Sequence, residues 1–542
     1  MNRPVVRSES LVLLIAGYLV LFANQTWWTG VLAGRSFAEV GNWWFALALG
    51  IALSAVHYVL FGLVAIGWFG RVVLSIAVIA AMAINYYMRT YGVVIDPTMM
   101  QNVLATDARE ASEFISRQSV LSIVLPAVPP LFFIWWVRFR SLPWGRALAW
   151  RLLSMLIALV LAAACVFSVY RDFSSLMRNE RGLRYRVTPA NIIYGTLHNL
   201  WGPAGKPDGP RSIVAADARF VGSELERPRV LVIVVGETAR AANFSLLGYS
   251  RDTNPQLLAR NVVAFRDVTA CGTSTEVSLP CMFSAVDRRD YDEDRIRTSE
   301  GLLDVLVRAG YRVFWRDNQS GCKGVCANPA IDSRTLRAKD NPQLCSADGC
   351  NDGVLAGALA DILHEPSARV AIVLHMLGQH GPAYYQRYPR AYRVFTPTCD
   401  TAELRRCTRE QVVNSYDNAL RYTDAVLASI IDLLAAQQSR IDSAMLFVSD
   451  HGESLGESGL YLHGMPYAIA PDVQLQVPMV FWATSGFMQL TRLDENCLRQ
   501  RAQQPAAHDN LFHSVLGILD VTTTAYDRSL DVLASCRNSA DP

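Results

Sequence analysis

Long, uninterrupted apolar runs dominate the first third of the chain. Each is close to the roughly twenty residues that a helix needs to cross the hydrocarbon core of a bilayer. The first run is followed by a second one and shows no small-residue cleavage site, so we expect it to remain as an anchor and not to be removed as a signal peptide. The runs predict five membrane-spanning helices, at residues 10–28, 43–66, 72–88, 119–137 and 148–169.

Arginine residues orient this predicted bundle. They cluster before the first span, between the second and third, and between the fourth and fifth, which are positions on one side of the membrane: Arg3, Arg7, Arg71, Arg138, Arg140, Arg146 and Arg151. The positive-inside rule makes that side cytoplasmic. Five spans then place the C-terminal half of the chain outside.

The pattern changes after residue 170. Residues 171–225 are basic and aromatic without a sustained apolar run, which predicts a linker or a helix lying on the membrane surface, with a solvated connector as the alternative. From 226 to 542, short apolar runs alternate with amphipathic segments such as 415–437. This alternation predicts an α/β domain with a mostly parallel sheet covered by helices on both faces. The strand candidates are 230–235, 368–377, 444–449 and 477–483.

Composition supports a membrane protein with an additional domain. The chain has 542 residues, too many for one core, and 51% of them are hydrophobic but only 18% charged. We therefore interpret residues 1–170 as a transmembrane domain, 171–225 as an interfacial linker and 226–542 as an exported catalytic domain. A net charge of +2 gives no indication of nucleic-acid binding.

The cysteines indicate an oxidising compartment. An even set confined to one half of the chain predicts disulfides. Zinc-ribbon ligands are the alternative, but the spacings do not repeat as paired CxxC units. Cys165, alone in an apolar segment, is expected to be a packed free thiol. The other ten cysteines fall into near-neighbour pairs: Cys271 with Cys281, Cys322 with Cys326, Cys345 with Cys350, Cys399 with Cys407, and Cys497 with Cys536.

Acidic and histidine residues follow the predicted strands. Glu237 follows the strand at 230–235, Asp450, His451 and Glu453 follow the strand at 444–449, and His375 and His380 end a third strand. Ligands of parallel sheets gather at the carboxyl ends of the strands, and crowded carboxylates repel unless a cation neutralises them. Mixed Asp, Glu and His ligands favour zinc, with manganese as a second possibility. Taken singly, each histidine fits a structural role and the SDHGE stretch fits a helix N-cap.

A candidate nucleophile lies in TACGTSTEVSLPCMFS, residues 269–284. Cys271 and Cys281 bracket a turn of small residues before a predicted helix start near Thr275. Free N–H groups at a helix N-terminus suit an anionic phosphoryl group, and a divalent cation can activate a hydroxyl beside it. A plain Thr/Ser helix cap is the alternative.

Several motifs together carry a resemblance to a known family. They are VIVVGETARAANFSLLGYSRDTNP, CGTSTEVSLPCMFS, DNQSGCKGVC, HMLGQHGPAYY and SDHGESLGESGLYLHG, and they follow five predicted spans. The chain resembles the lipid A phosphoethanolamine transferases, which include the mobile colistin-resistance enzymes and belong to the alkaline phosphatase superfamily. The resemblance covers nearly the whole chain. It implies an alkaline phosphatase/sulfatase-like catalytic domain in the periplasm, anchored in the bacterial inner membrane.

The resemblance also implies roles for individual residues. Thr275 would be the nucleophile, Glu237, Asp450 and His451 would hold the catalytic zinc with it, and His380 could carry the proton. Residues that would bind phosphoethanolamine or a second zinc are Lys323, His380, Glu453 and His463. The chain departs from the family at two positions: Gln319 stands where relatives carry Asn, and Glu276 replaces a small apolar residue beside the nucleophile.

A second group of polar residues lies between the third and fourth predicted spans. Asn102, Thr106 and Glu110 are spaced at i, i+4 and i+8, which predicts one face of one helix. The family resemblance links such a group to binding of the lipid substrate, where it would receive an ethanolamine ammonium. A solvated helix face is the alternative.

These observations predict a two-step transfer. Thr275 would take phosphoethanolamine from phosphatidylethanolamine and pass it to a phosphate of lipid A. Other acceptors remain open, namely core sugars of lipopolysaccharide, periplasmic glucans or proteins. The alternatives to this activity are a phosphoglycerol transferase, a sulfatase, which the absence of a Cys/Ser-x-Pro-x-Arg stretch disfavours, and a non-catalytic membrane sensor.

Overall fold

The protein folds as two compact units. In the computed structural model, one unit contains residues 1–100 and 114–200, and the other contains 101–113 and 201–542. The described residues are 3–65, 67–140, 143–201, 211–222, 226–337, 343–346 and 349–537. Parts of the predicted linker, residues 202–210 and 223–225, lie outside them.

Four helices of the first unit are long and apolar enough to cross a membrane: α3 (Val40–Gly62), α4 (Gly67–Tyr91), α7 (Arg117–Trp136) and α8 (Trp144–Ser168). Much of their apolar surface is exposed, as on α8, where Val160 is 62% exposed. Such exposure suits helices that face lipid. The helices that follow are α9 (Tyr170–Asn179) and α10 (Ala190–Trp201).

The first predicted span differs from the expectation of one straight helix. It consists of α1 (Ser8–Phe22) and α2 (Gln25–Val31), which meet at an angle of 62°. The break falls at Asn24, whose side-chain amide donates to the carbonyl oxygens of Leu19 and Thr188 and accepts from the Thr188 N–H. These buried bonds replace those that a continuous helix would make. The pair counts as a fifth span if it is taken as one broken helix.

The second unit is built on a seven-stranded, mostly parallel sheet, as predicted. Its strand order is β5-β15-β12-β4-β11-β7-β8. Within this order β4, β11, β12 and β15 match the four predicted strands, and β15 runs antiparallel to both of its neighbours. The strands are β4 (Arg229–Gly236), β5 (Val263–Phe265), β7 (Arg312–Asp317), β8 (Asp332–Thr335), β11 (Arg369–His375), β12 (Asp442–Ser449) and β15 (Met479–Ala483).

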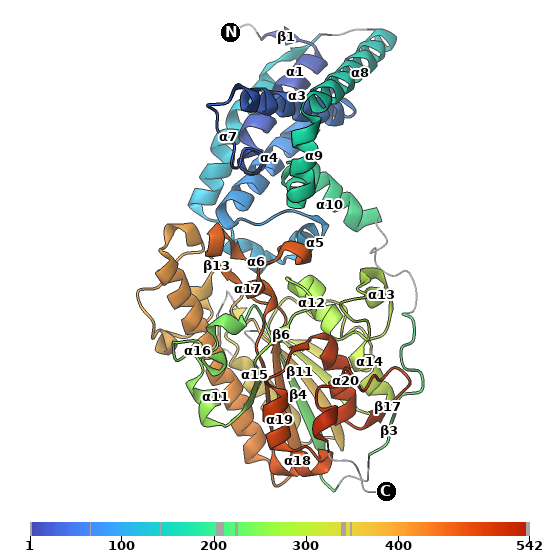
Figure 1. Cartoon of the computed structure of the whole chain (residues 1–542), viewed down its shortest axis with the longest axis vertical. Helices are drawn as coiled ribbons and strands as arrows, with labels where there is room; N and C mark the ends of the chain where they lie inside the picture. Colours follow the sequence, from blue (N-terminus) through green and yellow to red (C-terminus); the bar gives the residue numbers. More distant parts are fainter. Residues whose placement is uncertain are drawn as a thin grey trace. The chain divides into compact units, whose positions relative to one another are not determined.

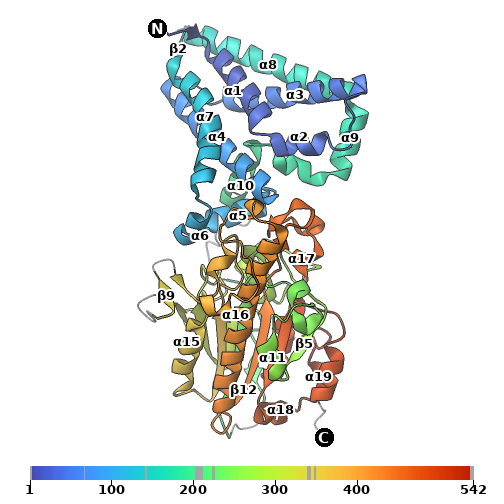
Figure 2. The same cartoon turned by 90° about the vertical axis from the view of Figure 1, so that its left-hand side faces the viewer.

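Helices cover both faces of this sheet (Figure 1). The long helix α16 (Arg409–Ala436) lies on one face (Figure 2). It starts six residues before the predicted segment because Thr408 and Gln411 form a capping box. The other face carries α12 (Thr275–Met282), α14 (Leu302–Arg308) and α20 (Asp509–Ile518).

Shorter helices complete the second unit. They are α6 (Ala108–Glu113), α11 (Pro255–Ala259), α13 (Glu293–Thr298), α15 (Val354–Leu363), α17 (Asp472–Leu475), α18 (Ser485–Thr491) and α19 (Glu495–Arg501), and α5 (Pro97–Ala105) joins the two units.

The cysteines pair as predicted. Cys165 is free and buried in the first unit. The ten cysteines of the second unit form disulfides and are therefore not zinc-ribbon ligands, which excludes the alternative reading. The five bonds join Cys271 to Cys281, Cys322 to Cys326, Cys345 to Cys350, Cys399 to Cys407, and Cys497 to Cys536.

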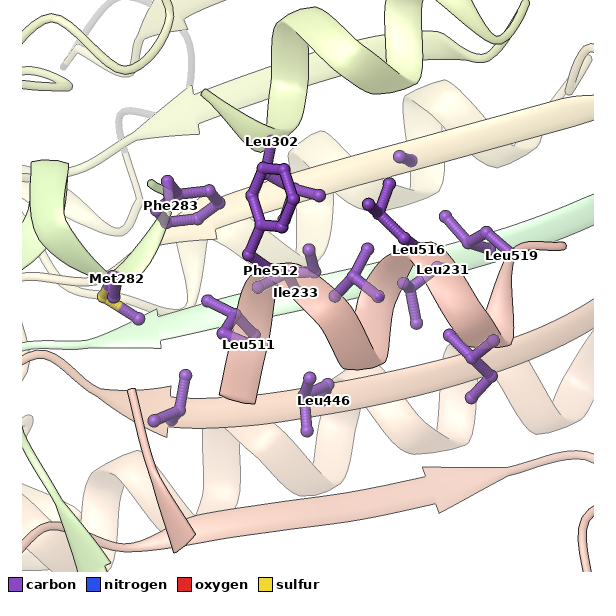
Figure 3. Packing of buried hydrophobic residues seen from close by; sticks show 14 of the residues in the cluster. Leu231, Ile233, Met282, Phe283, Leu302, Leu446, Leu511, Phe512, Leu516 and Leu519 are labelled. Atoms are coloured by element: carbon purple, nitrogen blue, oxygen red, sulfur yellow. The ribbon is translucent and has the colours of Figure 1, made fainter. Parts of the chain in front are cut away.

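The core between α20 and the sheet holds the second unit together. Figure 3 shows Phe512 and Leu516 of α20 packed over Leu231 and Ile233 of β4. All four side chains are buried, and Phe512 is fully buried. Close packing of this kind leaves little room for compensation when a large side chain is removed.

Phe512→Ala should therefore lower the free energy of unfolding by about 3–5 kcal/mol, the usual cost of deleting a buried aromatic ring. Chemical denaturation of the full chain in detergent, followed by tryptophan fluorescence, measures this change. The matched control is Leu258→Ala, because Leu258 is 67% exposed and its truncation should cost less than about 0.5 kcal/mol. Equal effects of the two substitutions would contradict this description of the core.

Candidate active site

The register of two neighbouring strands creates the candidate site. β4 and β12 run parallel, and Gly236 of β4 pairs with Ser449 of β12. Each is the last residue of its strand, so Glu237 and Asp450 leave the sheet side by side. His451 follows directly. The structure thus brings the three predicted metal ligands to one point at the carboxyl edge of the sheet.

The three side chains form a compact and fully buried cluster. One ligand atom from each of Glu237, Asp450 and His451 lies within 4.8 Å of the other two. His451 Nε2 lies 3.3 Å from Glu237 Oε1 and 3.4 Å from Asp450 Oδ2. The other ring nitrogen, Nδ1, lies 2.9 Å from the Gly452 carbonyl oxygen, a contact that directs Nε2 into the cluster.

Thr275 completes the cluster from the first turn of α12. Its hydroxyl donates to Glu237 Oε2 at 3.0 Å and lies 3.5 Å from His451 Nε2. Helix α12 is held against the strand ends, because Ser278 Oγ donates to the carbonyl oxygen of Asp450 at 2.5 Å. The Cys271–Cys281 disulfide closes the turn that leads into the helix.

The electrostatics of this cluster suit a cation. Burial, and next the Glu237 carboxylate, raise the pKa of Asp450 to about 7. Burial alone would lower the pKa of His451, but Asp450 and Glu237 outweigh it and raise the pKa to about 9. Asp450 Oδ2 is buried and has no hydrogen-bond partner among the described residues. Buried charges in proteins are normally paired or bound to a metal, so these residues fit a divalent ion.

A second layer of residues surrounds His463. Its ring centroid lies 4.3 Å from that of His451 and 5.6 Å from that of His380. His463 Nδ1 lies 2.7 Å from Glu453 Oε2, and the Tyr384 hydroxyl donates to the other oxygen of Glu453 at 2.5 Å. The structure therefore places His380, His463 and Glu453 together beside the cluster.

The predicted single helix carrying Asn102, Thr106 and Glu110 is wrong. Helix α5 ends at Ala105 and α6 begins at Ala108. The break occurs because Asp107 caps α6, its Oδ1 accepting from the Glu110 N–H at 2.9 Å. The three residues consequently do not share one helix face.

The side chains of Thr106 and Glu110 have different partners. Thr106 Oγ1 donates to the Asn102 carbonyl oxygen at 2.8 Å, a bond within the chain segment itself. Glu110 reaches the site, with Oε1 3.3 Å from His380 Nε2. Burial alone would lower the pKa of His380, but the Glu110 carboxylate outweighs it and raises the pKa to about 9. His380 is therefore protonated at neutral pH in this arrangement.

Gln319 and Glu276, the two positions where the sequence resemblance implies a departure, both have defined partners. Gln319 Nε2 donates to Glu237 Oε2 at 3.0 Å, so the longer amide contacts a candidate metal ligand. The Glu276 carboxylate contacts two cationic side chains. Its Oε1 accepts from Arg297 at 3.0 Å, and its Oε2 lies 3.5 Å from Lys323 Nζ.

Lys323 is held in a constrained position. It lies in the loop that the Cys322–Cys326 disulfide closes, and its φ of 47° falls in the left-handed region. Its ammonium donates to Ser320 Oγ at 2.9 Å. Through Glu276, this ammonium is tied to the first turn of α12, the turn that carries Thr275.

Comparison with known proteins agrees with this architecture. Residues 229–521 match the Sulfatase family model, and residues 53–201 match the model described as phosphoethanolamine transferase EptA/EptB. The chain is 36% identical to phosphoethanolamine transferase EptA of Salmonella typhimurium, over 100% of this chain and 99% of that protein. The chain belongs to the EptA family of phosphoethanolamine transferases.

Other members extend this relationship. The chain is 34% identical to phosphatidylethanolamine transferase Mcr-1 of Escherichia coli, over 94% of this chain and 95% of that one. The solved integral membrane lipooligosaccharide phosphoethanolamine transferase A of Neisseria meningitidis superposes with a TM-score of 0.94. That structure is 34% identical and covers 99% of this chain and 100% of its own. This member of the EptA family is thus a membrane-embedded phosphoethanolamine transferase with a sulfatase-like catalytic unit.

His375 was expected among the ligands at the strand ends, but it pairs with Asp317 instead. Its Nδ1 lies 2.7 Å from Asp317 Oδ1, and the pair joins the ends of β11 and β7. Asp317 is not identified from the sequence, because the strand that it ends, β7, is not among the predicted strands.

His508 was also missed. It accepts from the Cys271 N–H at 3.1 Å through Nδ1, and its Nε2 lies 2.9 Å from the Ser449 carbonyl oxygen. Burial lowers its pKa to about 4, so it is neutral at physiological pH. This histidine joins the turn before Thr275 to the end of β12, and nothing in its local sequence marks it.

Replacing Glu276 tests the ion-pair group beside Thr275. Glu276→Ala would leave Lys323 and Arg297 without this buried carboxylate. Breaking a fully buried pair costs about 3–5 kcal/mol, but Arg297 retains Glu293 at 2.9 Å. We therefore expect the free energy of unfolding to fall by about 1–3 kcal/mol in chemical denaturation. The exposed Glu365→Ala serves as control, and an unchanged stability in Glu276→Ala would show that the pairs contribute nothing.

Proposed function

We propose that this transferase moves phosphoethanolamine from phosphatidylethanolamine to a phosphate group of lipid A through a covalent adduct on Thr275. One observation carries this proposal. The Thr275 hydroxyl lies at the first turn of α12, within hydrogen-bond distance of Glu237 in a buried cluster of two carboxylates and an imidazole. This is the arrangement of an activated nucleophile beside a phosphoryl site.

The names of relatives support the two substrates. Mcr-1 of Escherichia coli is named a phosphatidylethanolamine transferase. The Neisseria meningitidis protein is named for lipooligosaccharide, and a more distant Escherichia coli relative, 26% identical, for Kdo(2)-lipid A. We extend a lipid donor and an acceptor of the lipopolysaccharide class from those proteins to this chain. The catalytic unit would then lie in the periplasm, with the apolar helices in the inner membrane.

The metal in this proposal is zinc, held by Glu237, Asp450, His451 and the Thr275 hydroxyl. Two carboxylates and one imidazole fit a zinc site that leaves a position for a hydroxyl. When bound, the ion would supply positive charge that favours deprotonation of Thr275 and offsets the charge of the phosphoryl oxygens. His380, His463, Glu453 and Lys323 would bind the phosphoethanolamine group or a second zinc.

The two steps balance in atoms and protons. In the first, a bond forms between Thr275 Oγ and phosphorus while the bond from phosphorus to the diacylglycerol oxygen breaks, and the proton of Thr275 ends on diacylglycerol. In the second, an oxygen of the acceptor phosphate attacks phosphorus, the bond to Thr275 breaks, and the acceptor's proton ends on Thr275. His380, protonated beside Glu110, is placed to give its proton to the leaving diacylglycerol oxygen, and the proton that Thr275 loses then restores it; the second step reverses this order with the acceptor's proton.

Thr275→Ala should abolish transfer. Mass spectrometry of lipid A from cells that express the intact chain should show added phosphoethanolamine, and the variant should show none because the attacking oxygen is missing. The added ammonium reduces the negative charge of lipid A, so only the intact chain should raise tolerance to polymyxin. Thr524→Ala, at an exposed threonine, is the control. Modified lipid A from the Thr275→Ala strain would refute the nucleophile, and modification of core sugars alone would redirect the acceptor.

Glu237→Gln should remove the metal. Elemental analysis of the purified full chain should find zinc in the unaltered protein and at least roughly a tenfold lower content in the variant, because an amide is a much weaker ligand than a carboxylate. Transfer should fall in parallel. The exposed Glu365→Gln is the matched control, and a variant that keeps its zinc would exclude Glu237 as a ligand.

A further inference from the structure

Two carboxylates of α6 contact the same catalytic loop. Helix α6 lies between α4 and α7 in sequence, but its residues belong to the catalytic unit by their contacts. Glu110 pairs with the side chain of His380, and Glu113 pairs with Arg387. Because the two glutamates are three residues apart, they lie on one face of α6.

Arg387 connects Glu113 to His380. Its Nε donates to the His380 carbonyl oxygen at 2.6 Å, while an Nη donates to Glu113. The side chains of Arg387 and Glu113 are only 3% and 11% exposed. An arginine that uses its planar fork in two directions within a buried site makes strong, oriented hydrogen bonds.

The Glu110–His380 and Glu113–Arg387 pairs have different roles during turnover. The sequence resemblance gives Glu110 the task of receiving the ammonium of the lipid donor. Under the proposed function, its contact with His380 would then open during turnover. If Glu110 were the only attachment, α6 would lose its contact with the loop at the moment when the donor binds. The Glu113–Arg387 pair does not involve the substrate and can persist.

We propose that Glu113 and Arg387 form a latch that keeps α6 docked on the His380 loop while Glu110 exchanges His380 for the donor ammonium. Glu113 and Arg387 are thus positioning residues, and this role rests on the proposed function. The latch fixes the distance between the donor-binding carboxylate and the proton carrier. Arg387 has the additional task of holding the backbone of His380.

Kinetics separate these two tasks. Glu113→Gln leaves the bond from Arg387 to His380 intact, so the KM for phosphatidylethanolamine should rise at least tenfold while kcat changes less than threefold. Arg387→Gln removes both bonds and should raise KM and lower kcat. Arg390→Gln, at an exposed arginine three residues further on, is the matched control. A Glu113→Gln enzyme with an unchanged KM would overturn the latch, and a fall in kcat alone would also overturn it.

Hydrogen exchange tests docking independently of transfer. In the full chain in nanodiscs, amide protection of residues 108–113 should fall at least tenfold in Glu113→Arg and in Arg387→Glu. The double exchange, Glu113→Arg with Arg387→Glu, should restore it. Unchanged protection in the single variants, or no recovery in the double variant, would overturn the proposal. If the unaltered chain transfers nothing, the proposed function fails, while the exchange result still decides whether the latch exists.

Discussion

The pairing of β4 with β12 is the constraint on which the rest of the site depends. Because Gly236 and Ser449 are in register, two carboxylates emerge together into a region without solvent. Such a pair is costly unless charge is supplied to it. The metal that we propose, held by these carboxylates and His451, would supply that charge, and the surrounding residues hold the Thr275 hydroxyl beside the cluster.

Several neighbouring segments pack around the ends of β4 and β12. Gly378 shows how closely they pack: with φ of +54°, it passes so near Glu237 that a Cβ would lie 2.5 Å from the Glu237 carbonyl oxygen. No other residue type fits there without displacement of the backbone. Ser278 and His508 fasten α12 and its preceding turn to the end of β12. These bonds hold Thr275 beside Glu237, a fixed position of the kind that catalysis by positioning would require.

Much of this arrangement could be predicted from local sequence. Buried parallel strands are continuous apolar runs, so β4, β11 and β12 were visible, and the strand-end rule identified Glu237, Asp450 and His451. β7 was not visible because its six residues include Arg312, Arg316 and Asp317, which interrupt the apolar pattern. The polar ends of this strand are explained only by partners elsewhere, such as Asp332 for Arg316.

The differences between the predicted and the observed structure have a common origin. They arise from bonds between distant residues or from side chains that end helices. The break in the first span depends on Thr188, which lies 164 residues from Asn24. The break between α5 and α6 depends on Asp107, which caps α6. A prediction from helical spacing alone does not take this cap into account. The role of Glu276 was open in the sequence because Arg297 and Lys323 come from separate segments. In each case the contact that decides the structure is either nonlocal or a local bond that competes with the helical pattern.

The covalent adduct tests the central claim most directly. The purified full chain, in nanodiscs that contain phosphatidylethanolamine and no acceptor, would be quenched in acid, digested and mapped by tandem mass spectrometry. We expect a single added phosphoethanolamine group on Thr275, which disappears when lipid A is supplied. The same preparation transferring phosphoethanolamine to lipid A without an adduct on Thr275, or with the adduct on another residue, would contradict the proposed mechanism.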